Sequence, residues 1–338
     1  MYEHECPSST MAHRKRGVHQ GILASVGNTP LVGLDRLFPN NQFTLYAKLE
    51  GANPGGSAKD RPALTMLSNA LEAGVIHPDT TIIESSSGNM GIGLAQACCY
   101  LHLPFICVVD VKTTRQNLSI LRAYEARIDI VSEPDPATGE FLQARLNRVR
   151  ALQNSITNSW WVNQYANTFN AVAYHGMMDE IVRQLGTAPD YLFCATGTCG
   201  TLRGCAEYIR DHTLETKIWA VDAVGSVIFG HKRQKRLVPG HGSACVPDLF
   251  TPGLAQRCIH VTDTDCIIGC RRLLRDEAIL AGGSSGAIVS AIEHVRGEIP
   301  RDAICVAVLA DRGERYMDTV YSDDWVREHF GDVLAEPA

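Results

Sequence analysis

Short runs of β-branched and aromatic residues alternate with longer amphipathic stretches along most of this chain. The runs have the length and composition of buried strands, and they lie at 44–49, 80–85, 105–110, 128–133, 191–196, 217–223 and 303–309. Stretches of helical length separate them, at about 61–73, 89–101, 114–125, 138–153, 171–185, 200–211, 264–280 and 286–296. Parallel strands joined by crossover helices produce this order. The alternation therefore predicts an α/β fold with doubly wound open sheets that carry helices on both faces.

The stretch WWVNQYANTFN at 160–170 interrupts the alternation, and candidate strands lie on both sides of it. We therefore expect two sheets in two domains. A chain of 338 residues, 45% of them apolar, is long enough to fill two cores. The expected boundaries are 53–167 for a smaller N-terminal domain, and 21–52 together with 168–338 for a larger one.

Residues 1–20 are polar, with a short basic cluster at 13–16 and no periodicity. A flexible tail explains this segment better than a nucleic-acid-binding arm does. The net charge of −6 gives no general attraction to nucleic acids or anionic membranes, and no apolar run has the length of a membrane span. We therefore expect a cytoplasmic protein whose partners are small molecules.

The twelve cysteines are scattered along the chain, and none of them forms a CxxC pair. No apolar signal segment precedes them, which favours a reducing compartment. The spacing of cysteines and histidines does not match that of zinc sites. The sequence therefore predicts reduced, mostly buried thiols and no metal site.

Four candidate strands are followed or neighboured by loops rich in glycine and hydroxyl residues. These loops are SSSGNMG at 85–91, TGTCGTLRG at 196–204, GGSSGA at 282–287 and ADRGERY at 310–316. Ligands of open α/β sheets bind at the carboxyl ends of the strands, where backbone N–H groups of the following helices attract anions. A single residue such as Ser87 or Asn89 would suffice to cap a helix, so three serines favour a binding loop. No dinucleotide or P-loop signature is present, and a phosphate-bearing cofactor is the remaining interpretation.

Lys59 lies in the stretch NPGGSAKDRPA at 53–63, between glycines and the start of a candidate helix. The helix dipole disfavours an ammonium at that position, and burial adds to the effect. A neutral lysine amine is a nucleophile that forms Schiff bases. The alternative, a solvated surface lysine, does not explain the flanking glycines.

Six motifs in this order resemble those of the cysteine synthase family, pyridoxal phosphate enzymes of fold type II with a fold like that of the tryptophan synthase β subunit. The motifs are NPGGSAKDRPA, SSSGNMG, NQYAN, GTCGT, GGSSGA and DRGERY, and the resemblance extends from about Gly27 to Tyr321. Further segments are similar to one branch of the family, the N-(2-amino-2-carboxyethyl)-L-glutamate synthases of 2,3-diaminopropionate and siderophore biosynthesis. These segments are AVDAVGSVIFG at 220–230, GCRRLL at 269–274 and DRGERYMDTVYSDDW at 311–325.

The resemblance implies a homodimeric transferase of amino-acid biosynthesis that holds pyridoxal 5'-phosphate on Lys59. Freed from the cofactor, Lys59 would remove the Cα proton of O-phospho-L-serine, phosphate would leave, and the amino group of L-glutamate would add at Cβ. Because the intermediate must be kept from water, we expect residues 85–140 to move on substrate binding.

The resemblance also implies roles for the residues of the motifs. The cofactor phosphate would be held by Gly197, Thr198, Cys199, Gly200 and Thr201, the ring hydroxyl by Asn89 and the ring nitrogen by Ser284. The substrate would contact Ser86, Ser87, Gly88, Asn89, Gln164 and Tyr165. Because phosphate and carboxylates call for guanidinium groups, Arg145, Arg203 and Arg312 are the candidate anion ligands.

Two residues depart from the family pattern, in which a threonine usually stands at Met90 and a glycine at Cys199. The GTCGT loop is more similar to that of ordinary cysteine synthases. A cysteine synthase that uses sulfide with O-acetylserine or O-phosphoserine is therefore an alternative, as is a serine or threonine dehydratase. An inactive family member that serves as a binding partner is a further alternative, which the presence of Lys59 disfavours.

Overall fold

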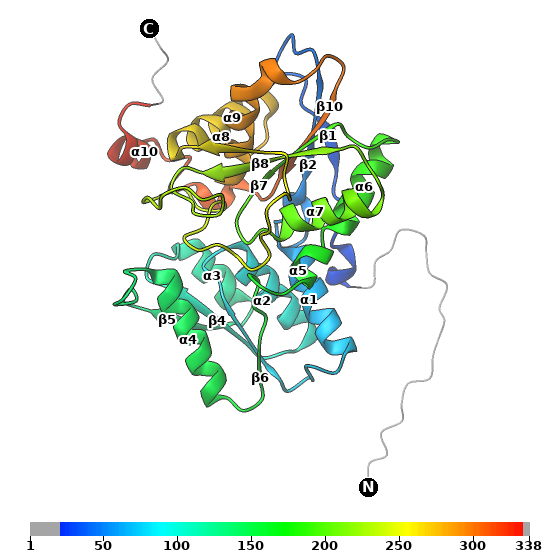
Figure 1. Ribbon diagram of the computed structural model, residues 1–338. Helices are drawn as coiled ribbons and strands as arrows, with labels where there is room; N and C mark the ends of the chain where they lie inside the picture. Colours follow the sequence, from blue (N-terminus) through cyan, green and yellow to red (C-terminus); the bar gives the residue numbers. More distant parts are fainter. Residues whose placement is uncertain (1–20, 334–338) are drawn as a thin grey trace.

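The computed structural model describes residues 21–333, so the tail predicted at 1–20 lies outside the described residues. The described chain forms two β-sheets, one of six strands and one of four. Each sheet has its own helices, and Figure 1 shows the smaller sheet with its helices below the larger one. The predicted fold of open α/β sheets is confirmed.

The smaller sheet consists of four parallel strands in the order β5-β4-β3-β6. They are β3 (Thr81–Ser85), β4 (Phe105–Asp110), β5 (Arg127–Val131) and β6 (Ser159–Trp161). The helices that cover it are α1 (Asp60–Glu72), α2 (Asn89–Leu101), α3 (Arg115–Ala123) and α4 (Phe141–Ser155). Ile82 packs into a core with α1, α2 and α3, whereas its neighbour Ile83 packs against α4. Since successive strand residues point to opposite faces, both faces of this sheet are buried.

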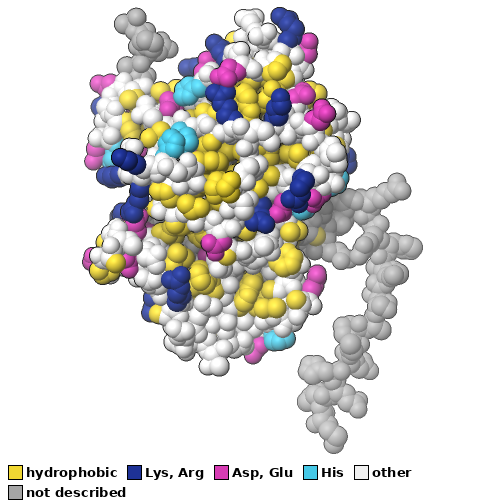
Figure 2. Space-filling model, viewed as in Figure 1, with side chains coloured by type: hydrophobic (Ala, Val, Ile, Leu, Met, Phe, Trp, Pro, Cys, Tyr) yellow, Lys and Arg dark blue, Asp and Glu magenta, His cyan; other side chains and the backbone are white. Residues whose placement is uncertain are grey.

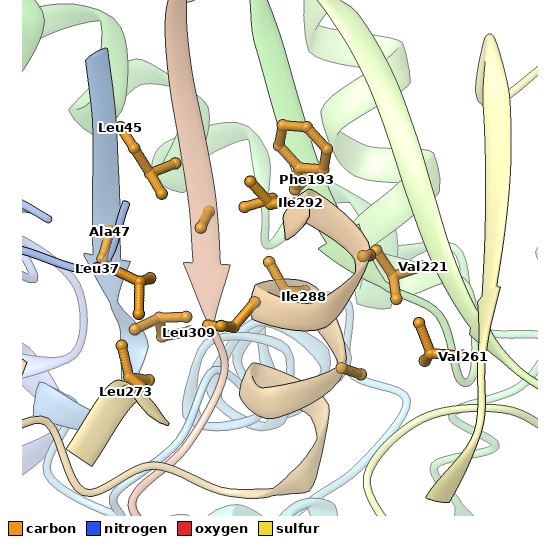
Figure 3. Close-up of a cluster of buried hydrophobic side chains, with 14 of the residues drawn as sticks. Leu37, Leu45, Ala47, Phe193, Val221, Val261, Leu273, Ile288, Ile292 and Leu309 are labelled. Atoms are coloured by element: carbon orange, nitrogen blue, oxygen red, sulfur yellow. The ribbon is translucent and has the colours of Figure 1, made fainter. Parts of the chain in front are cut away.

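The larger sheet has the order β1-β2-β10-β7-β8-β9, and all its neighbouring strands are parallel except β1 and β2. Its strands are β1 (Leu31–Gly33), β2 (Thr44–Leu49), β7 (Tyr191–Ala195), β8 (Lys217–Ala223), β9 (Arg257–Val261) and β10 (Ile304–Leu309). Helices α8 (Asp263–Glu277) and α9 (Gly283–Val295) cover one face, and α6 (His175–Leu185) and α7 (Gly200–Asp211) cover the other. Figure 3 shows Ile292 of α9 beside Phe193 of β7, and Ile288 and Val221 belong to the same core.

The remaining described elements are short. They are α5 (Phe169–Val172), α10 (Asp323–Phe330) and the 3-10 helices Ile22–Ser25, Glu50–Ala52, Arg296–Glu298 and Gly313–Tyr316. Acidic, basic and apolar side chains are interspersed over the face shown in Figure 2. Within residues 21–333, no helix combines the length and the apolar character needed to cross a membrane.

All seven predicted strands are present, but β1, β6 and β9 were not predicted. The first two have only three residues each, which is too short for a periodic signal. The helix predicted at 171–185 is divided into α5 and α6. The strands of the smaller sheet fall within 53–167 and those of the larger sheet in the other two ranges; the division into domains with these boundaries stays a prediction.

A buried ion-pair network connects α1 to the larger sheet. The Arg61 guanidinium on α1 donates to Glu50 (2.6 Å) and to Glu180 of α6 (2.8 Å). Lys48 of β2 pairs with Glu180 at 2.7 Å. Burial alone would raise the pKa of Glu180, but the hydrogen bonds and charge of Arg61, with hydrogen bonds from Lys48 and the amide of Asn28, lower it to about 2. The network fixes the helix whose N-terminus carries Lys59.

Candidate active site

Loops from both sheets meet at one cavity. All the predicted site residues except Arg203 and Arg312 line it. They are Lys59, Ser86, Ser87, Gly88, Asn89, Arg145, Gln164, Tyr165, Gly197, Thr198, Cys199, Gly200, Thr201 and Ser284. The sequence motifs, which lie up to 225 positions apart (59 to 284), thus converge on one site.

Lys59 is the residue that precedes α1. Its Nζ lies 3.4 Å from the hydroxyl of Tyr174, which in turn donates to the carbonyl oxygen of Ala58 (3.2 Å). Tyr174 is fully buried. It was not predicted, because nothing in the sequence around it marks a functional tyrosine.

Asn89, the first residue of α2, is held by two residues of the loop after β10. Its Nδ2 donates to Asp311 Oδ2 (2.7 Å), and its Oδ1 accepts from Arg315. Asp311 is buried and also accepts from the Tyr316 hydroxyl (2.5 Å). The sequence predicts Arg312 of the motif DRGERY as an anion ligand. In the structure, Asp311 and Arg315 of this motif contact Asn89 instead.

The serine loop caps the helix that follows it. Ser86 Oγ accepts hydrogen bonds from the amides of Gly91 (3.0 Å) and Gly88 (3.4 Å). Ser86 thus caps the helix, in place of Ser87 or Asn89, which the sequence indicates as candidate caps. A Cβ built on Gly88 would meet no atom within 4 Å. The loop therefore leaves open space in front of the N-terminus of α2.

Gln164 is positioned by a buried carboxyl group. Its side-chain amide donates to the Ser85 carbonyl (3.1 Å), and its backbone N–H donates to Glu84 (3.2 Å). Burial raises the pKa of Glu84 to about 7. Burial likewise raises the pKa of Tyr165 to about 12, so this neighbour of Gln164 stays a neutral phenol.

The glycine-rich loop at 197–201 ends at the N-terminus of α7. Cys199, the residue before that helix, has a φ of +63°, a conformation that favours glycine. This is the position at which the family that the sequence resembles usually has a glycine. Burial raises the pKa of the Cys199 thiol to about 12, so the side chain carries no charge that would repel an anion.

Gly197 and Gly200 have different structural roles in this loop. A Cβ on Gly200 would lie 2.2 Å from Asn170 Oδ1, and Asn170 donates to Thr198 Oγ1 (3.1 Å). A Cβ on Gly197 would meet nothing within 4 Å. Gly200 therefore permits the packing of Asn170, whereas Gly197 faces open space in the cavity.

These features fit a phosphate-bearing aldehyde. The Lys59 amine can form a Schiff base, and the open loop at the N-terminus of α7 provides N–H groups without helical partners for a phosphate. Ser284, in the first turn of α9, lines the same cavity opposite Gly240, whose Cβ would lie 3.5 Å from its Oγ.

The three candidate arginines differ in their surroundings. Arg145 lines the cavity with its Nε 3.4 Å from Asp110, and its buried Nε and NH1 atoms have no hydrogen-bond partner in the described chain. Arg203 pairs with Glu207 (2.8 Å) on the surface of α7, outside the cavity lining. Arg312 donates to the carbonyl oxygen of Gly51 (2.7 Å) and also lies outside the lining. The structure therefore brings only Arg145 of the three to the cavity.

A second, more open cavity adjoins the first and shares Ser87, Arg145, Tyr165, Gly240 and Gly242 with it. We call it the outer cavity. Its cationic lining residues are Lys112, Arg145, Arg233, Lys235 and Arg236. Among its described lining residues the single carboxylate is that of Glu140, which pairs with Arg233. The sequence carried a visible signal for it, the basic run HKRQKR at 231–236.

Three solved structures are similar to this chain over nearly their whole length. O-ureido-L-serine synthase has 26% identity and a TM-score of 0.83, with 91% of this chain and 98% of that one covered. A hydrogen sulfide-producing enzyme from Fusobacterium nucleatum has 29% identity and a TM-score of 0.82, with 88% and 100% covered. The O-acetylserine-dependent cystathionine β-synthase from Helicobacter pylori has 28% identity and a TM-score of 0.84, with 90% and 99% covered.

The family model for pyridoxal-phosphate-dependent enzymes matches residues 22–311, which include every cavity residue discussed above. Lys59, the open loop before α7 and the start of α9 are the features that fit this cofactor. The chain belongs to the family of pyridoxal-phosphate-dependent enzymes.

Proposed function

We propose that this enzyme joins O-phospho-L-serine and L-glutamate by β-replacement, giving N-(2-amino-2-carboxyethyl)-L-glutamate and phosphate. The bond from Cβ to the phosphate oxygen breaks, a bond from Cβ to the glutamate nitrogen forms, and the amine releases a proton. The product is a precursor of L-2,3-diaminopropionate. A homodimer and a cytoplasmic location stay predictions.

Pyridoxal phosphate, when bound, supplies an aldehyde for the substrate amine and an electron sink for charge that develops at Cα. Lys59 would take the Cα proton, and the Tyr174 hydroxyl 3.4 Å away orients its amine. Ser86, Ser87, Asn89 and Gln164 would hold the substrate carboxylate.

The observation that carries the choice of substrates is the Arg145 guanidinium beside a cationic cavity: its Nε lies 3.4 Å from Asp110, but its buried Nε and NH1 make no hydrogen bond in the described chain. Buried guanidinium nitrogens without partners are costly, and the Nε and NH1 atoms of Arg145 are in that state. An anion that reaches them would satisfy both. O-phospho-L-serine brings such a group at the position where the leaving group departs.

The outer cavity supports an anionic second substrate. Its lining has five cationic residues and one carboxylate, and that carboxylate is already paired. L-glutamate brings two carboxylates along with the amine that would attack Cβ. Sulfide, by contrast, does not need the outer cavity.

The similar structures favour one alternative in particular. The relative from Helicobacter pylori is named for its dependence on O-acetylserine, and the one from Fusobacterium nucleatum for the production of hydrogen sulfide. A cysteine synthase activity with O-acetylserine or O-phosphoserine and sulfide is therefore the second candidate function.

The decisive experiment incubates the purified holoenzyme with O-phospho-L-serine and, separately, L-glutamate, sulfide or no nucleophile. Phosphate release is measured, and products are identified by mass spectrometry with 15N-labelled glutamate. We expect phosphate release that depends on glutamate and a product that carries one 15N from it. The Lys59→Ala variant is the control and should release no phosphate above background.

The other outcomes each reject the proposal. Turnover with sulfide but not with glutamate would establish the cysteine synthase. Pyruvate as the main product in the presence of glutamate would establish a dehydratase. A purified protein that shows no visible cofactor band after incubation with pyridoxal phosphate, and no turnover, would indicate a binding partner.

A further inference from the structure

Three side chains that can ligate a metal ion converge at the open edge of the larger sheet. Asp222 lies on β8, and Cys258 and His260 lie two residues apart on β9, which is the edge strand. Asp222 and His260 are directly paired across the two strands, and Ala220 faces Cys258. The small side chain of Ala220 leaves room at the centre of this group.

The candidate ligand atoms lie close enough together for one metal ion to contact all three after small side-chain movements. His260 Nε2 lies 3.8 Å from Cys258 Sγ and 3.9 Å from Asp222 Oδ2. All three ligand atoms lie within 4.8 Å of one another. Zinc bonds of about 2.0–2.3 Å in a tetrahedral arrangement require ligand atoms roughly 3.3–3.6 Å apart, so the two distances from His260 need to shorten by about half an ångström and the distance between Asp222 and Cys258 by up to about 1.3 Å.

An independent observation points to a missing ligand at this position. Asp222 is fully buried, and its Oδ1 accepts from Thr196 Oγ1 (3.0 Å) and from the amide of Ala223 (2.9 Å). Its Oδ2, the oxygen that faces His260, has no hydrogen-bond partner in the described chain. At 3.9 Å the imidazole is too far away to donate. A buried carboxylate oxygen without a partner is costly, and a cation there would remove the cost.

The group is accessible from outside. Cys258 is half-buried and lines a surface cavity with Phe229, Phe250 and Arg257. The exposed ring of His231 stacks on that of His260 at 3.7 Å between centroids. Burial lowers the pKa of His260, which favours the neutral imidazole that metals bind, whereas burial raises the pKa of Cys258, so a metal ion has to displace the thiol proton.

We propose that Asp222, Cys258 and His260 form a binding site for a divalent metal ion of the zinc class, with a carboxylate oxygen, a thiolate sulfur and an imidazole nitrogen as ligands. Solvent occupies the fourth position of the tetrahedron. Binding releases the Cys258 thiol proton to solvent. The mixed sulfur, nitrogen and oxygen set favours zinc over magnesium or calcium, which prefer oxygen ligands.

The site adjoins the loop that would hold the cofactor phosphate, but it is separate from it. Asp222 contacts Thr196, which directly precedes Gly197, and the carbonyl oxygen of Thr196 accepts from Gly242 N (2.6 Å). None of the three proposed ligands lines the active-site cavity. The metal site therefore does not depend on which amino-acid substrates the enzyme uses.

The experiment uses untagged holoenzyme, ZnCl₂ as the probe and two readouts. After incubation and gel filtration, the bound zinc is measured by inductively coupled plasma mass spectrometry. We expect one zinc ion per chain. In parallel, iodoacetamide labelling is followed at individual cysteines by peptide mapping. Zinc should slow the labelling of Cys258 at least about tenfold, because the coordinated sulfur is withdrawn from reaction, while the exposed Cys99 of the same molecule reacts at an unchanged rate.

The variants Cys258→Ser and His260→Gln should each bind zinc at least about tenfold more weakly, since loss of a direct ligand costs no less than loss of an outer contact. Their matched controls are Cys99→Ser and His212→Gln, which should bind zinc as the parent does. Circular dichroism checks that the variants fold. If Cys258→Ser fails to fold, His260→Gln and the labelling of the parent protein still decide. The proposal would be overturned if the ligand variants retained as much zinc as the parent. It would also be overturned if the parent bound zinc while Cys258 was labelled at an unchanged rate.

Discussion

Asn89 Nδ2 donates a 2.7 Å hydrogen bond to Asp311 Oδ2, and this bond connects the N-terminus of α2 with the end of β10 in the other sheet. The substitution Asp311→Asn removes the charge from the acceptor that Asn89 and the Tyr316 hydroxyl share. Loss of a hydrogen bond to a buried carboxylate costs about 1.5–3 kcal/mol. We therefore expect pyridoxal phosphate to bind roughly 10–100-fold more weakly, as measured by absorbance titration of the apoenzyme.

The matched control for this variant is Asp318→Asn, an exposed aspartate in the same loop region. It should bind the cofactor as the parent does. If Asp311→Asn bound the cofactor with unchanged affinity, the connection would have no part in positioning Asn89.

The network around Glu180 should determine the acid stability of the protein. The pKa of Glu180 in the folded protein is lowered to about 2. Its ionised form therefore contributes fully to the free energy of unfolding above the ordinary glutamate pKa of 4.5, and this contribution is lost as the pH falls through 2. Glu180→Gln leaves Arg61 and Lys48 without this counter-charge and should lower the free energy of unfolding at pH 7 by about 3–5 kcal/mol. Urea unfolding of the parent and the variant at pH 7, 4 and 3 measures this difference in the free energy of unfolding.

The difference between Glu180→Gln and the parent should shrink below pH 4.5. Glu207→Gln is the control, because Glu207 pairs with Arg203 at the surface. Both side chains of that pair are partly accessible to solvent, and removing such a pair changes the free energy of unfolding by about 1 kcal/mol or less. A constant difference between parent and variant from pH 7 to pH 3 would mean that Glu180 stabilises the fold without its charge.

Much of the fold was predictable because parallel strands buried on both faces give long apolar runs. The elements that were missed lack such a signal. β9 has the sequence RCIHV, in which arginine and histidine stand at the sheet edge. β1 forms a strand by antiparallel pairing with β2, and three residues are too few to show a period.

The lining of the cavity was predictable where one motif supplies both the turn and the polar groups, as at Lys59 and at 197–201. It was not predictable where a side chain acts from another element. Tyr174 reaches Lys59 from the turn before α6, and Asp222 meets Cys258 and His260 only through the pairing of β8 with β9. In the loop after β10, sequence alone could not distinguish Arg312, which turns to Gly51, from Arg315, which contacts Asn89.

Gly197→Ala should weaken cofactor binding without unfolding the protein. The added methyl group enters space that no protein atom occupies, in front of the α7 N-terminus, and would exclude a phosphate from close approach. We expect the dissociation constant for pyridoxal phosphate to rise about tenfold or more and the melting temperature of the apoenzyme to stay within about 2 °C. Gly176→Ala, also a glycine with open space around its Cβ position, is the control. Equal cofactor affinity in both variants would show that the phosphate lies elsewhere.

Arg145 provides the test of charge recognition in the active site. Arg145→Met keeps the length of the side chain but removes the cation whose Nε and NH1 make no hydrogen bond in the described chain. A charge-assisted hydrogen bond contributes about 1.5–3 kcal/mol, so kcat/KM for O-phospho-L-serine should fall roughly 10–100-fold. O-acetyl-L-serine has an uncharged leaving group, and its kcat/KM should change less than about threefold. Arg148→Met, on the same helix but paired with Asp129 at the surface, should leave both values unchanged. An equal loss with the two substrates would mean that Arg145 supports the cavity through Asp110 and does not bind the phosphate, because only a direct contact distinguishes the charged leaving group from the neutral one.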